Sequence, residues 1–156
     1  VQPANFNAPG QVVIAGTKAS VERASALAAA RKLKAIPLKV SAPFHCALMA
    51  PAAERMRAEL EAVAFGPLEF PVVSNVEARP NDDPRRVAEL LVRQIDGAVR
   101  WQQTVALMAA QGVDRALEIG PGKVLAGLVK RIDKRISVHS VGDPESVARL
   151  AEARGA

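Results

Sequence analysis

The feature that most constrains the fold is a regular alternation of strand and helix patterns after residue 113. Residues 114–119 and 136–141 predict strands, and residues 123–134 and 144–154 predict helices. Strands that alternate with helices favour a layered fold with parallel strands. Hydrophobic residues make up 49% of the chain and aromatic residues only 3%, so the core is expected to pack through aliphatic side chains. The second half is therefore predicted to be an α/β unit.

The first forty residues follow a different pattern. Residues 11–15 predict a strand after a turn, residues 21–33 a helix capped by Thr17 or Ser20, and residues 35–40 another strand. Residues 1–7 are expected to be the end of a strand already under way. Because the first residue is Val1 rather than Met, the numbering is expected to start inside a larger protein. The order predicts part of a small α+β unit with an antiparallel sheet.

The stretch between these two parts is predicted to be mostly helical. Helices are expected over residues 51–64, from Pro84 or Arg85 to about residue 95, and over residues 101–110, and Gly97 and Gly112 end the last two. A strand is expected over residues 70–76, and residues 80–84 are expected to form a loop.

The sequence argues against a nucleic-acid partner and against membrane contact. The formal net charge of +5 and the isoelectric point of about 9.9 fit either a solvated basic surface or an acidic partner. No nucleic-acid partner is expected, because basic residues are not interleaved with exposed aromatic residues and no recognition motif is present. No apolar run approaches the roughly 20 residues that cross a bilayer, and no secretory signal opens the chain, so no membrane contact is expected.

Cysteine and histidine usage narrows the chemistry further. The single cysteine, Cys46, excludes an internal disulfide and fits a reducing, cytoplasmic compartment. With only two histidines, His45 and His139, and no cysteine cluster, no metal site is expected.

His45 is the strongest candidate for a catalytic residue. It lies at a predicted strand-to-helix junction, and histidine side chains titrate near neutral pH, as a general base requires. The alternative is a histidine that only satisfies local hydrogen bonds at an element boundary. Cys46 is adjacent in sequence, so its side chain points elsewhere, and it is expected to be a buried filler. No Gly-x-Ser-x-Gly pattern is present. The chain therefore contains half of an active site at most.

Other motifs are weaker. The run Gly120-Pro121-Gly122-Lys123 follows a predicted strand, but it lacks the upstream glycine of a phosphate loop, and Val124 follows the lysine where that loop has Ser or Thr. It predicts a tight turn, whose helix N-terminus can still favour an anion. Asn5 and Asn7 lie in a turn-rich segment and fit local turn hydrogen bonds, and Gln94 lies near a helix end without a distinguishing feature.

Taken together, the motifs resemble the malonyl-CoA:acyl carrier protein transacylases of fatty acid synthesis. The matching stretches follow the order of that family and cover essentially the whole chain. They are residues 5–16, 40–49, 91–94 and 120–125, with Gly127-Leu128 and Lys130-Arg131.

The resemblance implies a two-step acyl transfer through a malonyl-serine intermediate, with malonyl-CoA as substrate and no cofactor. His45 matches the histidine base, and Gln94 matches the glutamine whose backbone carbonyl holds the histidine ring. Asn5 and Asn7 match residues that line the cleft between the two subdomains of the family. Phe44 resembles the residue found in relatives that select malonyl groups.

The chain also departs from the family. The serine elbow, the carboxylate-binding arginine and the oxyanion-hole glutamine belong to the first half of that fold, and none is present. The resemblance implies an α/β fold with two incomplete parts. Residues 1–42 would be part of a small ferredoxin-like subdomain, and residues 43–156 the C-terminal part of an α/β-hydrolase-like parallel-sheet core. An exposed apolar face and a partner, the N-terminal half of the same enzyme, are expected.

The implied partners are acyl carrier protein and a coenzyme A thioester. Six basic residues are candidates for docking the acidic carrier protein: Arg31, Lys32, Lys34, Lys39, Lys130 and Arg131. Two alternatives stay open, namely half of a polyketide synthase acyltransferase domain and a non-catalytic module that binds carrier protein.

Overall fold

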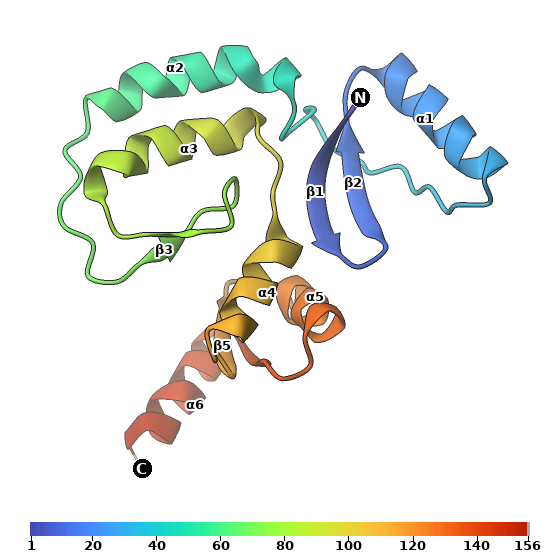
Figure 1. Cartoon of the computed structure of the whole chain (residues 1–156). Coiled ribbons are helices and arrows are strands. Elements are labelled where there is room, and N and C mark those ends of the chain that lie inside the picture. The colour runs from blue at the N-terminus through green and yellow to red at the C-terminus, as the bar shows by residue number, and fades with distance from the viewer. Residues whose placement is uncertain (156) are drawn as a thin grey trace. The chain divides into compact units, whose positions relative to one another are not determined.

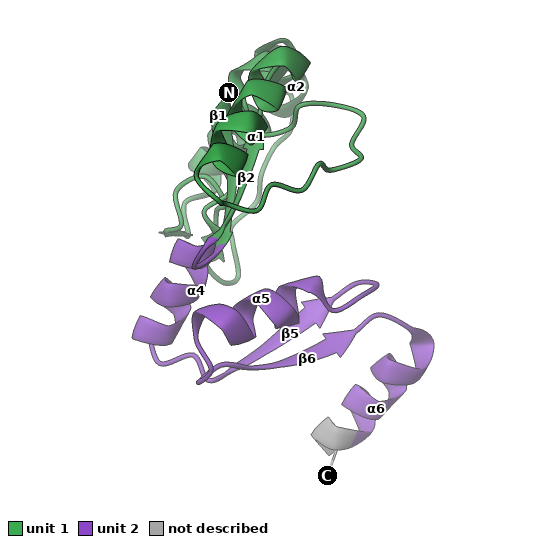
Figure 2. Cartoon of the chain, turned by 90° about the vertical axis from the view of Figure 1, so that its right-hand side faces the viewer, with its two compact units in different colours: residues 1–7, 11–101 green, residues 8–10, 102–156 purple. Residues whose placement is uncertain are grey.

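A computed structural model describes residues 1–155 of the chain (Figure 1). The fold is mixed α/β, with helices and three two-stranded sheets among the described residues. The chain divides into two compact units (Figure 2). The first contains residues 1–7 and 11–101, and the second contains residues 8–10 and the chain from residue 102 onward. No helix in the described part of the chain is long and apolar enough to cross a membrane.

A hairpin and a helix open the chain. Strand β1 (Gln2–Ala8) pairs with β2 (Gln11–Ala15) across a turn in which Gly10 has a φ of 73°, a conformation that suits glycine. Helix α1 (Lys18–Ala30) begins at Thr17, whose hydroxyl accepts a hydrogen bond from the Ser20 amide at 3.3 Å. The predictions of a first and a second strand are confirmed. Of the two candidate caps, Thr17 and Ser20, the structure uses Thr17, and the helix begins and ends about three residues earlier than expected.

The strand predicted over residues 35–40 is wrong. No regular structure follows α1 until residue 47, and the apolar side chains of this stretch are exposed, with Ile36 65% accessible. A strand forms only where a neighbour completes its hydrogen-bond ladder, and no strand of the described chain lies beside this stretch. Pro37 also removes one backbone donor. The stretch is one part of the exposed apolar surface that the sequence predicts.

Two packed helices form the centre of the first unit. The short η1 (Ala47–Met49) leads into α2 (Ala50–Glu61), and η2 (Pro84–Arg86) leads into α3 (Val87–Asp96). Helices α2 and α3 lie side by side (Figure 1) and bury Ala53, Leu90 and Val92. Gly97 ends α3, as predicted.

The strand expected over residues 70–76 is much shorter in the structure. Only β3 (Val72–Val73) forms, and it pairs antiparallel with β4 (Pro80–Asn81), inside the stretch expected to be a loop. Residues 74–79 make a tight turn between them, in which the Ala78 amide donates to the Ser74 carbonyl at 2.9 Å. This turn ends the strand early because its backbone bonds are satisfied locally.

The second unit contains the predicted parallel pair. After α4 (Trp101–Ala110) the order is β5 (Arg115–Ile119), α5 (Val124–Ile132), β6 (Ser137–Val141) and α6 (Pro144–Gly155). Strands β5 and β6 are parallel and in register from Arg115 with Ser137 to Ile119 with Val141, and α5 lies along them (Figure 2). The prediction from strand–helix alternation is confirmed. Ile119, at the end of β5, is 83% exposed.

Candidate active site

His45 is held by the end of helix α3. Its backbone amide donates to the Ile95 carbonyl at 3.2 Å, and its ring nitrogen Nδ1 lies 2.8 Å from the Gln94 carbonyl oxygen. The backbone of His45 has a φ of 60°, a left-handed conformation that a residue with a Cβ adopts at a cost. The two bonds to α3 hold His45 in this conformation. The structure therefore brings together the two residues that the resemblance pairs.

The contact with Gln94 sets the tautomer of the imidazole. A carbonyl oxygen only accepts hydrogen bonds, so Nδ1 must carry the proton that is donated. In the neutral ring Nε2 is then left with its lone pair. A histidine with an acceptor at Nε2 and a fixed ring plane has the properties of a general base.

Two further contacts fix the loop around His45. The Ala47 amide donates to the Gln2 side-chain oxygen at 2.8 Å, which ties the first turn of η1 to β1. Cys46 is 1% exposed, and its Sγ donates to the Pro43 carbonyl at 3.1 Å. The thiol is a buried, free cysteine within this loop. Gln2 was not predicted from the sequence, because nothing in its neighbours indicates a contact 45 residues away.

Of the three other candidate site residues, Asn5 and Asn7 lie in β1, and Phe44 directly precedes His45. Asn5 and Asn7 are half-buried in β1, and because they are two residues apart they point to the same side of the strand. Two backbone hydrogen bonds join this strand to Val99. The Phe6 amide donates to the Val99 carbonyl, and the Val99 amide donates to the Ala4 carbonyl, both at 2.8 Å. Phe44, next to His45, is exposed.

The turn before α5 is closed by a carboxylate. Glu118 accepts hydrogen bonds from the amides of Leu125 at 2.8 Å and Ala126 at 3.1 Å, and from the Ser140 hydroxyl at 3.1 Å. Desolvation raises the pKa of Glu118, but these hydrogen bonds outweigh it and hold the pKa below its usual value. Two of the first amides of α5 are therefore already occupied by Glu118, and the part of the prediction that concerns an anion at this helix N-terminus stays a prediction.

The six candidate docking residues are all exposed. Arg31, Lys32, Lys34 and Lys39 follow α1 in the first unit, and Lys130 and Arg131 lie in the last turn of α5 in the second. Arg131 also donates to the Pro9 carbonyl at 3.3 Å. Among the described residues, no group of three or more histidine, cysteine, aspartate or glutamate side chains is arranged to hold a metal ion.

Comparisons with known proteins agree on one family. The family model for the acyl transferase domain matches residues 1–151. The malonyl CoA-acyl carrier protein transacylase of Escherichia coli (strain K12) is 46% identical over 153 residues, which are 97% of this chain and 50% of that relative. The chain thus spans about half the length of the curated relatives it matches.

Solved structures agree with the sequence comparison. A malonyl-transacylase in complex with a type II PKS acyl-carrier protein superposes with a TM-score of 0.91 at 48% identity, covering 97% of this chain and 50% of that one. An acyl carrier protein S-malonyltransferase from Vibrio cholerae superposes with a TM-score of 0.90 at 45% identity, covering 96% of this chain and 49% of that one. Both similarities extend over nearly the whole of the present chain.

Proposed function

The chain belongs to the acyl transferase domain family, and we propose that it supplies the histidine base of a malonyl-CoA:acyl carrier protein transacylase. The observation that carries this proposal is the 2.8 Å contact between His45 Nδ1 and the Gln94 carbonyl, which leaves Nε2 as a proton acceptor. The 46% identity of the chain to a bacterial malonyl CoA-acyl carrier protein transacylase supports malonyl-CoA and acyl carrier protein as the proposed substrates.

The proposed reaction uses His45 twice. A serine on the N-terminal half attacks the malonyl thioester of coenzyme A while Nε2 of His45 takes the serine proton. The C–S bond breaks, and the coenzyme A thiolate leaves with that proton. In the second step the phosphopantetheine thiol of acyl carrier protein gives its proton to Nε2 and attacks the malonyl-serine, and the imidazolium returns the proton to the serine oxygen. No cofactor or metal takes part in these steps.

Substrate binding is proposed for three residues. Two of them, Asn5 and Asn7, lie in β1, and the third, Phe44, directly precedes His45. Asn5 and Asn7, which share one side of the strand, would line the cleft that receives the substrate. Phe44 would limit the size of the acyl group. Replacing Phe44 with Ala is expected to reduce discrimination between malonyl and methylmalonyl groups, measured as the ratio of kcat/KM for the two thioesters. An unchanged ratio would refute the assignment.

Carrier-protein docking is proposed for the exposed basic residues. Arg31, Lys32, Lys34 and Lys39 in the first unit and Lys130 and Arg131 in the second carry positive charge toward solvent, and one similar structure is a complex with an acyl-carrier protein. Charge reversal is expected to raise the KM for carrier protein and to reduce its salt dependence. If only the coenzyme A kinetics changed, the docking assignment would fail.

The N-terminal half of the enzyme is the proposed partner of the exposed apolar surface. Leu33, Ile36, Leu38 and Val40 in the first unit, and separately Ile119 and Val124 in the second, are large apolar side chains open to solvent. In the complete fold we propose a ferredoxin-like subdomain that includes residues 1–42 and an α/β-hydrolase-like core that includes residues 43–156. The free, buried Cys46 is compatible with a reducing, cytoplasmic location.

The decisive experiment measures malonyl transfer by the complete enzyme that contains this chain. After incubation with malonyl-CoA, the intact mass should reveal a malonyl adduct on the serine-bearing half. Replacing His45 with Ala is expected to slow formation of that adduct by about 10²–10⁴-fold, the usual contribution of a general base. His139→Ala is the matched control, because His139 is the other histidine of the chain and lies in β6. Equal rates for the two variants would refute the proposal.

A further inference from the structure

We propose that Glu77 is a positioning residue for His45 and acts through Arg93 and the last turn of helix α3. The inference rests on the proposed function of His45. Glu77 is far from His45 in sequence, and neither the family resemblance nor the sequence patterns assign a role to it. What points to it is an ion-pair cluster at the end of the helix that holds the imidazole.

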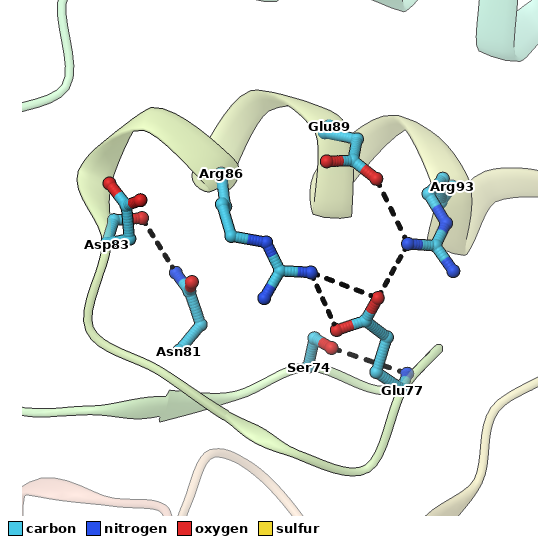
Figure 3. Close-up of polar contacts among 7 residues, drawn as sticks. All are labelled: Ser74, Glu77, Asn81, Asp83, Arg86, Glu89 and Arg93. Carbon is cyan, nitrogen blue, oxygen red and sulfur yellow. Dashed lines mark hydrogen bonds and ion pairs between the residues drawn. The ribbon is translucent and has the colours of Figure 1, made fainter.

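The carboxylate of Glu77 joins two arginines of one helical segment (Figure 3). Its Oε1 accepts from Arg93 Nη1 at 2.6 Å, and both of its oxygens accept from Arg86 Nη2 at 3.0 and 3.1 Å. The Glu77 side chain is only 18% exposed, whereas those of the two arginines are about 40% exposed. Glu89 accepts from Arg93 at 3.1 Å as an i,i+4 pair on the same helix. Glu77 therefore contributes the one carboxylate of this cluster that lies outside the helical segment.

Arg93, the residue of α3 that Glu77 holds, is next to the residue whose carbonyl accepts the hydrogen bond of the His45 ring. Arg93 directly precedes Gln94, whose carbonyl accepts from His45 Nδ1, and the Arg93 carbonyl accepts from the Gly97 amide at 3.0 Å. Both residues lie in the last turn of α3, where the Gln94 and Ile95 carbonyls find their partner in His45. A shift of Arg93 consequently shifts the carbonyl that orients the ring.

The turn that carries Glu77 is held by its own hydrogen bonds. The Ala78 amide donates to the Ser74 carbonyl at 2.9 Å, and the Glu77 amide donates to the Ser74 hydroxyl at 3.4 Å. Ala78 itself has a φ of 52°. The same turn reaches Gln94 through Asn75, whose side chain donates to the Gln94 side chain at 3.4 Å. The shorter, charged contact with Arg93 is the stronger of the two links.

Electrostatics favour the charged form of Glu77. The hydrogen bond from Arg93 and then that from Arg86 hold the pKa of the Glu77 carboxyl below its usual value. Without the carboxylate, Arg86 and Arg93 would face each other as like charges, and Arg93 would keep only Glu89. The last turn of α3 would then lose its tether to the 74–79 turn.

The test replaces Glu77 with Gln, which keeps the shape and removes the charge. Asp83→Asn is the matched control, since Asp83 pairs with Arg85 at 2.9 Å before the same helix and its loss changes the net charge equally. The first readout is the ¹⁵N spectrum of the histidine imidazoles in the complete enzyme that contains this chain, where His139 is an internal reference. E77Q is expected to shift the Nδ1 signal of His45 and leave that of His139 in place, while D83N shifts neither.

The second readout is malonyl transfer by the complete enzyme. E77Q is expected to lower kcat by about tenfold or more with little change in the KM for malonyl-CoA, because a displaced base slows the chemical step rather than binding. If E77Q does not fold, Arg93→Lys tests the same link, because it retains the charge but loses the planar fork. Unchanged His45 signals, or equal effects of E77Q and D83N, would overturn the proposal.

The two readouts separate this inference from the proposed function. The ¹⁵N signals report the position of the ring whether or not the chain catalyses transfer. If E77Q moves the His45 signals while His45→Ala leaves transfer unchanged, the positioning is correct and the proposed function is wrong.

Discussion

Replacing Gly97 with Ala should destabilise the first unit and disturb His45 at the same time. Gly97 ends α3 with φ −90° and ψ 150°, an extended conformation that any residue adopts, so the backbone itself does not require glycine. The requirement comes from space. A Cβ at this position would lie 2.5 Å from the Arg93 carbonyl oxygen and 2.7 Å from Cγ2 of Val76. Real Cβ atoms do not approach other atoms so closely, and one of these neighbours must move.

The size of the effect follows from two opposing contributions. Overpacking of this kind costs about 1–3 kcal/mol. The alanine also reduces the conformational entropy of the unfolded chain, which returns about 0.4–1 kcal/mol. The net loss in the free energy of unfolding is therefore expected to be between about 0 and about 2.6 kcal/mol, with a middle value of about 1.3 kcal/mol. Because one of the two neighbours is the Arg93 backbone, relief of the clash moves the last turn of α3, and the Gln94 carbonyl moves with it.

Urea denaturation followed by circular dichroism measures this change. The matched control is Gly127→Ala in α5, where an added Cβ meets nothing within 4 Å and is expected to stabilise the helix by about 0.5–1 kcal/mol. The ¹⁵N spectrum of Gly97→Ala should show a shifted His45 signal. If Gly97→Ala is as stable as Gly127→Ala, or loses stability without any shift at His45, the coupling of Gly97 to the imidazole is refuted.

Three further predictions follow from other contacts. His45→Gly should be more stable than His45→Ala by about 1 kcal/mol, because only glycine relieves the strain at a φ of 60°, and equal stabilities in urea would contradict this. Gln94→Met should keep the His45 Nδ1 signal in place, since the bond uses the main-chain carbonyl; a shift as large as that in Glu77→Gln would contradict it. The Arg135 guanidinium and amide lower the pKa of Asp133 from 3.8 to about 2, so the carboxylate contributes stability above about pH 4 that is lost as the pH falls toward 2. Asp133→Asn should therefore lower Tm at pH 7, and its difference from the unchanged chain should shrink below pH 4; a constant difference would contradict this.

The parts of the fold that were predictable depend on local signals. Thr17 was one of two candidate caps, with Ser20, because a hydroxyl before an apolar periodic run satisfies the first amides of a helix. Strands β5 and β6 were recognised as parallel because the helix between them leaves few other topologies. Gly97 was recognised as a helix end. In each case the information lies within a few residues of the element itself.

The errors occur where a distant neighbour decides the outcome. Residues 35–40 have the composition of a strand, but in the described chain no second strand lies beside them. Residues 70–76 were expected to be extended throughout, but the local bonds of Ser74 convert their end into a turn. The same turn presents Glu77 to Arg93, a contact between residues 16 positions apart that no periodic pattern indicates. Only the i,i+4 spacing of Glu89 and Arg93 could have indicated that Arg93 takes part in an ion pair.

The acceptor of His45 illustrates why a site of this kind is hard to find in one sequence. Any residue at position 94 would offer a main-chain carbonyl, so the identity of Gln94 does not encode the contact. What matters is that residues 94 and 95 lie in the last turn of α3, where helix carbonyls have no partner within the helix. His45 uses both, one for its amide and one for its ring. The partial negative charge of the helix C-terminus thus lies beside the imidazole, where a side-chain carboxylate would otherwise be needed. The residues that fix the end of that helix, Glu77 and Gly97, therefore matter to the imidazole although neither contacts it.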